Sequence, residues 1–259
     1  MTPPFSGQTQ SAIQFAADLF RGAKRAVALT GAGLSTPSGI PDFRSEGKGL
    51  WSHDEPMEVA SLSTFRTAPE RFFQWFRPLA SQIFNALPNP AHQALAELER
   101  AGRLQAVITQ NIDVLHQKAG SQRVIEMHGT LRTLSCTQCF RQVESTPYMK
   151  PFSEQGVMPH CPHCGALLKP DVILFGEQLP QKAWYAAQHE ARQCDLMVVV
   201  GSSLEVLPVA GLPIQALDRG AHLIILNNTP TYLNVRADVT ILEDVADVLP
   251  AIAEKTLHG

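Results

Sequence analysis

The sequence has no apolar run long enough to cross a membrane. Its longest runs, such as Leu196–Val200 and Leu223–Leu226, fall far short of the roughly 20 residues that a transmembrane helix needs. Residues Met1–Gln10 contain neither a basic start nor an apolar stretch. We therefore expect no export signal, no membrane partner and a cytoplasmic protein.

An excess of one charge is missing as well. The formal net charge is −3 over 259 residues, which gives no general attraction to nucleic acid or to anionic lipid. We therefore expect no stable binding of nucleic acid. Hydrophobic residues make up 44% and charged residues 17%, which is typical of a globular chain that buries one large core, with or without a smaller insert.

Cysteine is scarce, and its odd count of five argues against a disulfide scaffold. Cys194 adjoins an apolar run and is predicted to be a small buried hydrophobe. The other four form two Cys-x-x-Cys pairs, which residues 140–160 separate: Cys136, Cys139, Cys161 and Cys164.

Two such pairs supply four thiolates, the ligand set of a tetrahedral zinc site. Four thiolates leave no position for water, so the sequence predicts a structural zinc ion, one per chain, instead of a catalytic one. The alternative is two redox-active pairs, but neither pair opens a helix in a thioredoxin-like context. His160 and His163 adjoin the cysteines and are predicted to be surface residues.

Short aliphatic runs separated by helical patterns predict alternating strands and helices. Gly22, Gly102 and Gly220 follow helical patterns at positions suited to helix ends. Such alternation indicates an α/β fold with a doubly wound, Rossmann-like parallel sheet. The predicted strands are Ala26–Thr30, Ala106–Thr109, Val124–Met127, Leu196–Val200, Leu223–Leu226 and Val239–Leu242, and the predicted helices are Ile13–Arg21, His92–Arg100, Gln181–Arg192 and Val209–Asp218.

Polar and glycine-rich residues follow several of these strands. Gly31 and Gly33 follow the first one, where glycine allows a backbone to approach a pyrophosphate. The third glycine of the dinucleotide fingerprint is replaced by Thr36, so a tight turn without a ligand is an equal alternative. His128 follows Val124–Met127, although most histidines in such places are structural. Asn111 could simply cap a helix over Ile112–Ala119.

Seven motifs in a fixed order resemble the sirtuin family of NAD-dependent protein-lysine deacylases, of bacterial or archaeal type. The resemblance extends from about Thr30 to about Pro250. The motifs are Gly31–Arg44, Thr109–Asp113, Glu126–Thr130, the four cysteines, Lys169–Glu177, Gly201–Pro208 and Leu226–Thr229.

The resemblance implies a division of the chain into three parts. A Rossmann-like NAD-binding domain would comprise residues 1–37, 79–129 and 170–259. Residues 38–78 would form a cofactor-binding loop with a helical insert, and residues 130–169 a zinc-ribbon module.

The resemblance also implies the reaction and the site residues. NAD is the co-substrate, acyl-lysine proteins are the substrates, and the products are nicotinamide, O-acetyl-ADP-ribose and deacetylated lysine. His128 is the catalytic general base towards a ribose hydroxyl of NAD, for which its ordinary pKa of about 6.5 is suitable. The implied cofactor contacts are Gly31, Ala32, Gly33, Asp42, Phe43, Arg44, Gln110, Asn111, Asp113, Gly201, Ser202, Ser203, Asn227 and Val245, and the implied substrate contacts are Val172, Phe175, Gly176 and Glu177.

Individual roles follow from the same resemblance. Asn111 and Asp113 would form the nicotinamide pocket, and Gln110 would contact the ribose. Phe43 would shield the reactive carbon, and Asn227 would hold the adenosine ribose. The backbone of Val245 would contact the adenine, at a position where the family usually has a smaller residue.

The resemblance also bears on which acyl group is removed. Family members that prefer acidic acyl groups carry a Tyr and an Arg at positions that align with Phe76 and Leu79. Neither side chain can pair with a carboxylate, and Arg77 lies on another face of the helix. We therefore expect acetyl-lysine to be cleaved faster than succinyl-lysine.

Other functions stay open from the residues alone. Longer aliphatic acyl groups or mono-ADP-ribosyl transfer are alternatives within the family. An NAD-linked dehydrogenase is a remote one, because the third glycine and an acidic residue after the second predicted strand are missing. A nucleic-acid-binding zinc ribbon is disfavoured by the lack of a basic cluster around Cys136–Cys164.

Overall fold

The computed structural model describes residues 5–42 and 55–259, without the side chains of residues 56 and 57. Its larger part is built on a six-stranded parallel sheet in the order β3-β2-β1-β7-β8-β9. The predicted doubly wound α/β fold is therefore confirmed. The strands are β1 (Ala26–Thr30), β2 (Ala106–Thr109), β3 (Val124–Glu126), β7 (Leu196–Val200), β8 (His222–Leu226) and β9 (Val239–Ile241).

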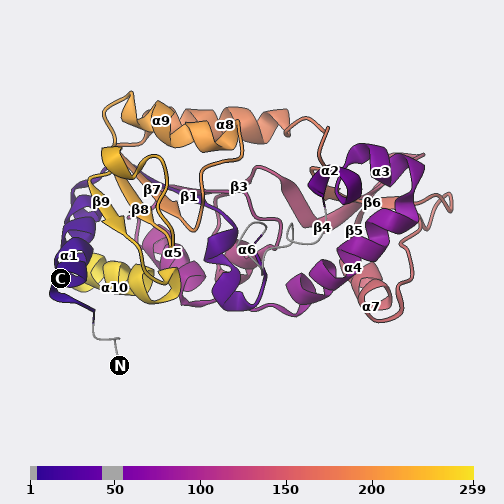
Figure 1. Ribbon diagram of the computed structural model, residues 1–259, viewed down its shortest axis with the longest axis horizontal. Helices are drawn as coiled ribbons and strands as arrows, with labels where there is room; N and C mark the ends of the chain where they lie inside the picture. Colours follow the sequence, from indigo (N-terminus) through magenta and orange to yellow (C-terminus); the bar gives the residue numbers. More distant parts are fainter. Residues whose placement is uncertain (1–4, 43–54) are drawn as a thin grey trace.

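Helices cover both faces of this sheet (Figure 1). In β1, Ala26 and Ala28 face one core, and Val27 and Leu29 face the other, because side chains alternate along a strand. The first face is covered by α1 (Gly7–Gly22), α5 (Pro90–Arg100) and α10 (Val245–His258). The second is covered by α8 (Gln181–Gln193) and α9 (Leu212–Leu217). Buried on both sides, these strands read as continuous apolar runs.

Two of the predicted helices differ in detail from those in the structure. Gly22 is the last residue of α1, but the chain leaves the helix through extended Ala23 and not through a left-handed glycine. The helix predicted over Val209–Asp218 is a 3₁₀ turn, η4 (Val209–Gly211), followed by α9, which has a proline in its first turn. Gly102 and Gly220 adopt positive φ, as expected of residues that terminate helices.

A smaller part lies beyond the β3 edge of the sheet (Figure 1). It contains an antiparallel sheet in the order β5-β4-β6, formed by Gln142–Glu144, Gly129–Cys136 and Leu168–Val172. Its helices are α2 (Pro56–Val59), α3 (Leu62–Thr67), α4 (Pro69–Asn85) and α7 (Thr146–Gln155). Residues of both the predicted helical insert and the predicted zinc-ribbon module contribute to one shared core.

Helix α7 lies in a stretch that shows little helical periodicity in the sequence. Pro147 and Pro151 weaken the local signal. The helix is stabilised by tertiary contacts instead, because Phe152 packs edge-on against Phe73 and stacks on Phe76, both in α4. Packing has overridden local preference here.

The remaining short elements connect these layers. They are η1 (Ala32–Leu34), η2 (Thr36–Ser38), α6 (Leu115–Ala119) and η5 (Asn234–Arg236). Within the described ranges, no helix combines the length and the apolar character needed to span a membrane.

Candidate functional site

The two glycine-containing loops meet at the point where the strand order reverses. β1 and β7 are neighbours in the sheet, yet the chain leaves them towards opposite edges, which is where α/β proteins form a ligand crevice. The loop after β1 is bonded to the loop after β7, since Gly33 N–H donates to Gly201 O at 2.8 Å and Gly31 N–H donates to Val200 O at 3.1 Å.

Glycine is required at these positions by the contact between the loops. A Cβ on Gly33 would lie 2.9 Å from both Cα and O of Gly201, and one on Gly201, where φ is +61°, would lie 2.1 Å from Leu34 N. These neighbours are backbone atoms that cannot turn aside. The structure thus adds a reason for the glycines besides the approach of a pyrophosphate.

A buried polar cluster lies beneath the first loop. Asn111 Nδ2 donates to Gly31 O at 3.0 Å and to Ser35 Oγ at 3.1 Å, and Ser35 Oγ donates to Asp113 Oδ2 at 2.6 Å. Burial raises the pKa of Asp113, and the hydrogen bonds from Ser35 and from Leu115 N–H oppose that rise. Ser35 was not among the predicted site residues, although it belongs to the same motif as Gly31 and Gly33.

The alternative role of Asn111 as a helix cap is wrong. The helix begins only at Leu115, after Val114 in a left-handed conformation. The side chain of Asp113 accepts the hydrogen bond from Leu115 N–H at 2.9 Å. Asn111 is thereby left to bind the glycine loop.

His128 lies at the carboxyl edge of the sheet with its orientation set by the backbone. Its Nδ1 is 3.0 Å from Gln110 O, and because a carbonyl only accepts, Nδ1 carries the proton. Nε2 is then the basic nitrogen of the neutral ring. Burial lowers the pKa of His128, and the bond to Gln110 O partly offsets this, so the ring is neutral at pH 7.

Gln110 also links this histidine to the second loop. Its Nε2 donates to Ser202 Oγ at 2.9 Å, and Asn227 Nδ2 donates to Ser202 O at 3.4 Å and to Thr229 O at 2.9 Å. Ser202 and Asn227 are buried, whereas Ser203 is exposed. Residues from the ends of β2, β7 and β8 thus form one connected polar surface.

A second network, absent from the sequence reasoning, lies behind this surface. Thr30 Oγ1 donates to Thr109 Oγ1 at 2.9 Å and lies 2.9 Å from His116 Nε2. Since its one proton is already used, His116 Nε2–H must be the donor to Thr30. Thr109 Oγ1 in turn accepts from Asn111 N–H at 3.0 Å. The ring of His116 contacts that of His92 edge-to-face, with centroids 5.1 Å apart.

The predicted substrate residues lie at the end of strand β6 and directly after it. Ile173 N–H donates to His128 O at 2.9 Å, so this segment is bonded directly to the catalytic candidate. Val172 is buried in the core of the smaller part, Phe175 is 42% exposed, and Gly176 has a φ of +87°. Glu177 forms an ion pair with Lys169 at 2.9 Å.

The remaining predicted contacts are spread around the same edge. Ala32 lies in η1, and Asp42 is the last described residue before residue 55. Phe43 and Arg44 lie outside the described residues. Val245 begins α10 with its side chain packed in the core, so a ligand could meet only its backbone.

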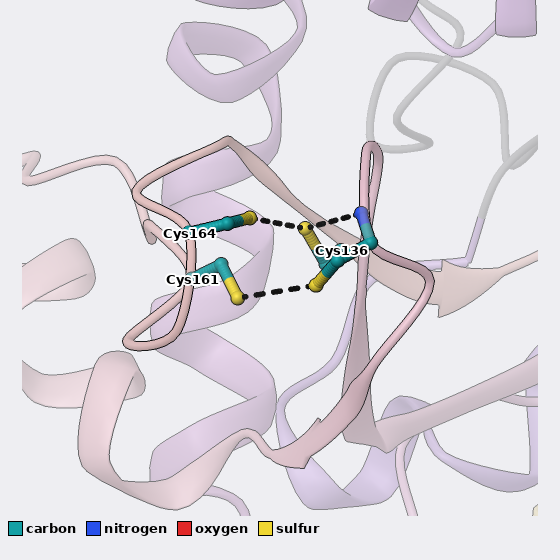
Figure 2. A group of neighbouring side chains, drawn as sticks. Cys136, Cys161 and Cys164 are labelled. Carbon is teal, nitrogen blue, oxygen red and sulfur yellow. Dashed lines mark hydrogen bonds between the residues drawn. The ribbon is translucent and has the colours of Figure 1, made fainter.

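The four paired cysteines converge at one point (Figure 2). Their sulfur atoms all lie within 4.8 Å of one another, with Cys136 Sγ 3.4 Å from Cys164 Sγ and Cys139 Sγ 3.7 Å from Cys161 Sγ. Tetrahedral zinc with Zn–S bonds of about 2.3 Å places its sulfurs about 3.8 Å apart. The cysteines therefore fit zinc, and the two short contacts join the two pairs to each other.

Backbone hydrogen bonds favour the thiolate form of Cys136 and of Cys161. Hydrogen bonds from the backbone N–H groups of Cys139 and Gln138 to its sulfur lower the pKa of Cys136 to about 6. The N–H groups of Cys164 and His163 lower the pKa of Cys161 in the same way. His160 and His163 are exposed, and Cys194 is buried in the core, as predicted.

Comparisons with known proteins agree with this geometry. The profile of the Sir2 family matches residues 31–208. NAD-dependent protein deacylase 2 of Archaeoglobus fulgidus is 47% identical over 94% of this chain and 95% of its own length. The NAD-dependent protein deacetylase of Sulfurisphaera tokodaii is 43% identical over 93% and 96% of the two chains.

Solved structures agree as well. A chain from a structural study of the mechanism and regulation of Sir2 enzymes is 46% identical, with a TM-score of 0.88 over 96% of this chain and 98% of its own. Sir2Af2 bound to a myristoylated histone peptide is 41% identical, with a TM-score of 0.81 over 95% and 97%. With motif order, fold, zinc-type cluster and near full-length identity in agreement, the chain belongs to the Sir2 family, the sirtuins.

Proposed function

We propose that this chain is an NAD-dependent protein-lysine deacetylase. It converts acetyl-lysine, NAD and water into deacetylated lysine, nicotinamide and O-acetyl-ADP-ribose. Relatives that match nearly all of the chain are named NAD-dependent protein deacetylases and deacylases. The observation that carries the proposal is His128, a neutral imidazole whose basic Nε2 is set by the bond from Nδ1 to Gln110 O, at the edge of the sheet where a dinucleotide binds.

NAD would be held between the two glycine-containing loops. Gly31, Ala32 and Gly33 would contact its pyrophosphate, and Gly201–Ser203 its phosphate and ribose groups. Asn227 would hold the adenosine ribose, with its amide already placed by Ser202 O and Thr229 O. NAD supplies an electrophilic ribose carbon, from which nicotinamide leaves and to which the acyl oxygen of the substrate bonds.

His128 would then act as the general base. Nε2 takes the proton of a ribose hydroxyl, and Gln110 O stabilises the resulting imidazolium through Nδ1–H. Because the lowered pKa keeps the ring neutral at pH 7, the base is present in its active form. The side chain of Gln110, bonded to Ser202 Oγ, keeps this ribose-facing surface in one arrangement.

Asn111 and Asp113 would form the nicotinamide pocket. Both are buried, at 9% and 4% exposed, and Ser35 bonds to both. An amide and a carboxyl group held in this way can receive a carboxamide and turn it out of the plane of its ring. Their burial keeps water from the carbon that nicotinamide leaves.

Zinc would stabilise the fold and take no part in the reaction, because four cysteine ligands leave no coordination position for water. Thiol ligands stay reduced in the cytoplasm, and we place the enzyme there. Its proposed partners are acyl-lysine proteins and not nucleic acids.

The acyl group we propose is acetyl in preference to an acidic one. Phe76 and Leu79 are each 3% exposed and pack in the core. The guanidinium of Arg77 is already bonded to Ser153 O at 3.0 Å and to Glu154 O at 2.6 Å. These positions on α4 therefore present no cation to a succinyl carboxylate. Longer aliphatic groups are a second candidate, since a relative is named a deacylase and Sir2Af2 was solved with a myristoylated peptide.

A mass-spectrometric assay tests the proposal. One lysine peptide is prepared with acetyl, myristoyl and succinyl groups and is incubated with and without NAD. We expect NAD-dependent loss of acetyl with formation of O-acetyl-ADP-ribose, and much slower loss of succinyl. Formation of NADH, or no acyl loss from any peptide, would refute the proposed activity. Comparable cleavage of the succinyl peptide would refute the specificity argument.

A further inference from the structure

Lys169 has the contacts of a positioning residue, unlike an ordinary surface lysine. It lies in β6, and its side chain is only 17% exposed. Its ammonium group donates to Val172 O at 2.8 Å and to Pro170 O at 3.2 Å, and pairs with Glu177 Oε2 at 2.9 Å. A lysine ammonium has three N–H donors, so its contacts with the protein use all of them.

The partner carboxylate closes a turn. Glu177 Oε2 also accepts from Leu174 N–H at 2.8 Å, and Glu177 N–H donates to Leu174 O at 2.9 Å. Gly176 inside the turn has a φ of +87°. The conformation of residues 174–177 therefore depends on one carboxylate, which is itself held by Lys169.

This turn connects the elements that surround the proposed peptide site. Phe175 N–H donates to Ala60 O and Phe175 O accepts from Leu62 N–H, both at 2.9 Å. Just before the turn, Ile173 N–H is bonded to His128 O. At the other end of β6, Lys169 pairs with Ser135 next to Cys136. Strand β6 and the residue after it thus connect the zinc-binding module to His128 through backbone hydrogen bonds.

We propose that Lys169 is a positioning residue for the acyl-lysine peptide, acting through Glu177 on residues 172–177. This inference rests on the proposed function. Without the ammonium group, Val172 O and the carboxylate of Glu177 lose a charged partner. The carboxylate then turns towards water and releases Leu174 N–H, so the peptide-binding segment is no longer preformed. The affinity for the acyl-lysine peptide should therefore fall, while the two loops that would bind NAD keep their contacts.

The test compares Lys169→Met, which keeps the length of the side chain, with Lys169→Arg and with Lys150→Met. Lys150 is a matched control in the same module, 71% exposed in its side chain. We expect Lys169→Met to raise KM for the acetyl-lysine peptide roughly tenfold, the effect of losing one charged hydrogen bond. KM for NAD, kcat and zinc content should change little. Lys169→Arg should restore most of the peptide affinity, and Lys150→Met should resemble the wild type.

Two further measurements keep the inference separate from the proposed activity. The dissociation constant of a fluorescein-labelled acetyl-lysine peptide reports binding even if the wild type shows no turnover. In addition, the double variant Lys169→Met/Glu177→Gln should bind the peptide no more weakly than the weaker-binding of the two single variants, because the two residues act as one unit. Unchanged peptide affinity in Lys169→Met, or parallel loss of peptide affinity, NAD affinity and zinc, would overturn the inference.

Discussion

At the scale of single residues, local hydrogen bonds set the tautomers of two histidines. The carbonyl of Gln110 holds the proton of His128 on Nδ1, which leaves Nε2 available for the proposed role as base. The hydroxyl of Thr30 holds the proton of His116 on Nε2. A histidine is useful in catalysis only in the right tautomer, and here local hydrogen bonds decide it.

His128→Ala should abolish deacetylation. Removing a general base typically lowers the rate by a hundredfold or more, and we expect at least about that fall in kcat. The variant should still fold and bind NAD, because the two glycine loops do not depend on the imidazole. Steady-state kinetics measure the first effect, and calorimetric NAD titration with thermal unfolding measures the second. Turnover close to that of the wild type would show that His128 is not the base.

A second residue-scale prediction concerns pH and the buried pair of His92 and His116. His92 is fully buried, and burial lowers its pKa to about 4. The pKa of His116 is lowered by burial and, to a lesser degree, by His92. None of the described residues supplies a hydrogen-bond partner to either ring nitrogen of His92. Both rings are therefore neutral in the folded protein.

Acid should destabilise the fold through these histidines. In the unfolded chain they protonate near pH 6.5, so between pH 6.5 and about 4 the unfolded state binds more protons. The stabilisation due to neutral His92 is complete above pH 6.5 and lost as pH falls to about 4. It amounts to about 1.4 kcal/mol per pH unit, or about 3 kcal/mol in all.

Urea unfolding at pH 7.5, 5.5 and 4.5 tests this in the wild type and in His92→Phe. The phenyl ring replaces two unpartnered nitrogens, so the free energy of unfolding at pH 7.5 should change by no more than about 1 kcal/mol. Between pH 6.5 and about 4, the free energy of unfolding of the variant should depend less steeply on pH. The difference should correspond to about one proton fewer taken up on unfolding. Asp113, whose pKa is raised, acts in the opposite sense but equally in both proteins. Equal pH dependence in both would contradict the assignment.

At the scale of elements, the proposed NAD site depends on the contact between the loop after β1 and the loop after β7. Three glycines allow the two backbones to approach each other. The hydrogen bonds of Gly31 and Gly33 to Val200 and Gly201 then fix their relative position. Neither loop could keep this shape without the other.

Gly33→Ala should therefore weaken NAD binding strongly. The new Cβ would meet backbone atoms of Gly201 at 2.9 Å, so the loops must separate, at a cost of about 1–3 kcal/mol in stability. Gly211→Ala is the matched control, because a Cβ there meets nothing within 4 Å and its φ is −83°. Calorimetric titration with NAD measures the effect. An unchanged dissociation constant in Gly33→Ala would disprove this account of the loops.

At the scale of the whole molecule, the zinc module and the proposed active site share strands. β4 begins at Gly129, beside His128, and ends at the zinc ligand Cys136. β6 pairs with β4 and leads into the proposed substrate segment. We therefore expect a metal ion in the small module to influence the proposed site through the shared sheet.

Cys161→Ser should release zinc and reduce activity together. The wild type should contain one zinc ion per chain, and loss of one thiolate opens a site that contributes directly to folding. The β4–β6 sheet then loosens, and the peptide-binding segment with it. Cys194→Ala is the control, since Cys194 lies in the sheet core away from the cluster. Metal analysis measures the zinc content of the reduced protein, and steady-state kinetics measure its activity. Full activity in zinc-free protein would contradict the proposed link between zinc and the active site.

Much of this architecture could be predicted from local patterns. The buried strands of the parallel sheet, each Cys-x-x-Cys pair and the position of His128 after a strand are each encoded by residues that lie a few positions apart. The reason is physical. Apolar periodicity reports which face of an element is buried, and a Cys-x-x-Cys turn places its two sulfur atoms close together through local geometry alone.

Tertiary structure decided what depends on residues far apart in the chain. Only folding brings Gly33 against Gly201, Asn111 beneath the glycine loop and Ile173 onto His128. The same holds for α7, which forms because Phe152 packs on α4, and for the buried pair of His92 and His116. Local propensity carries no information about a partner some 25–170 residues away along the chain, so these contacts, and the tautomers they set, follow from packing alone.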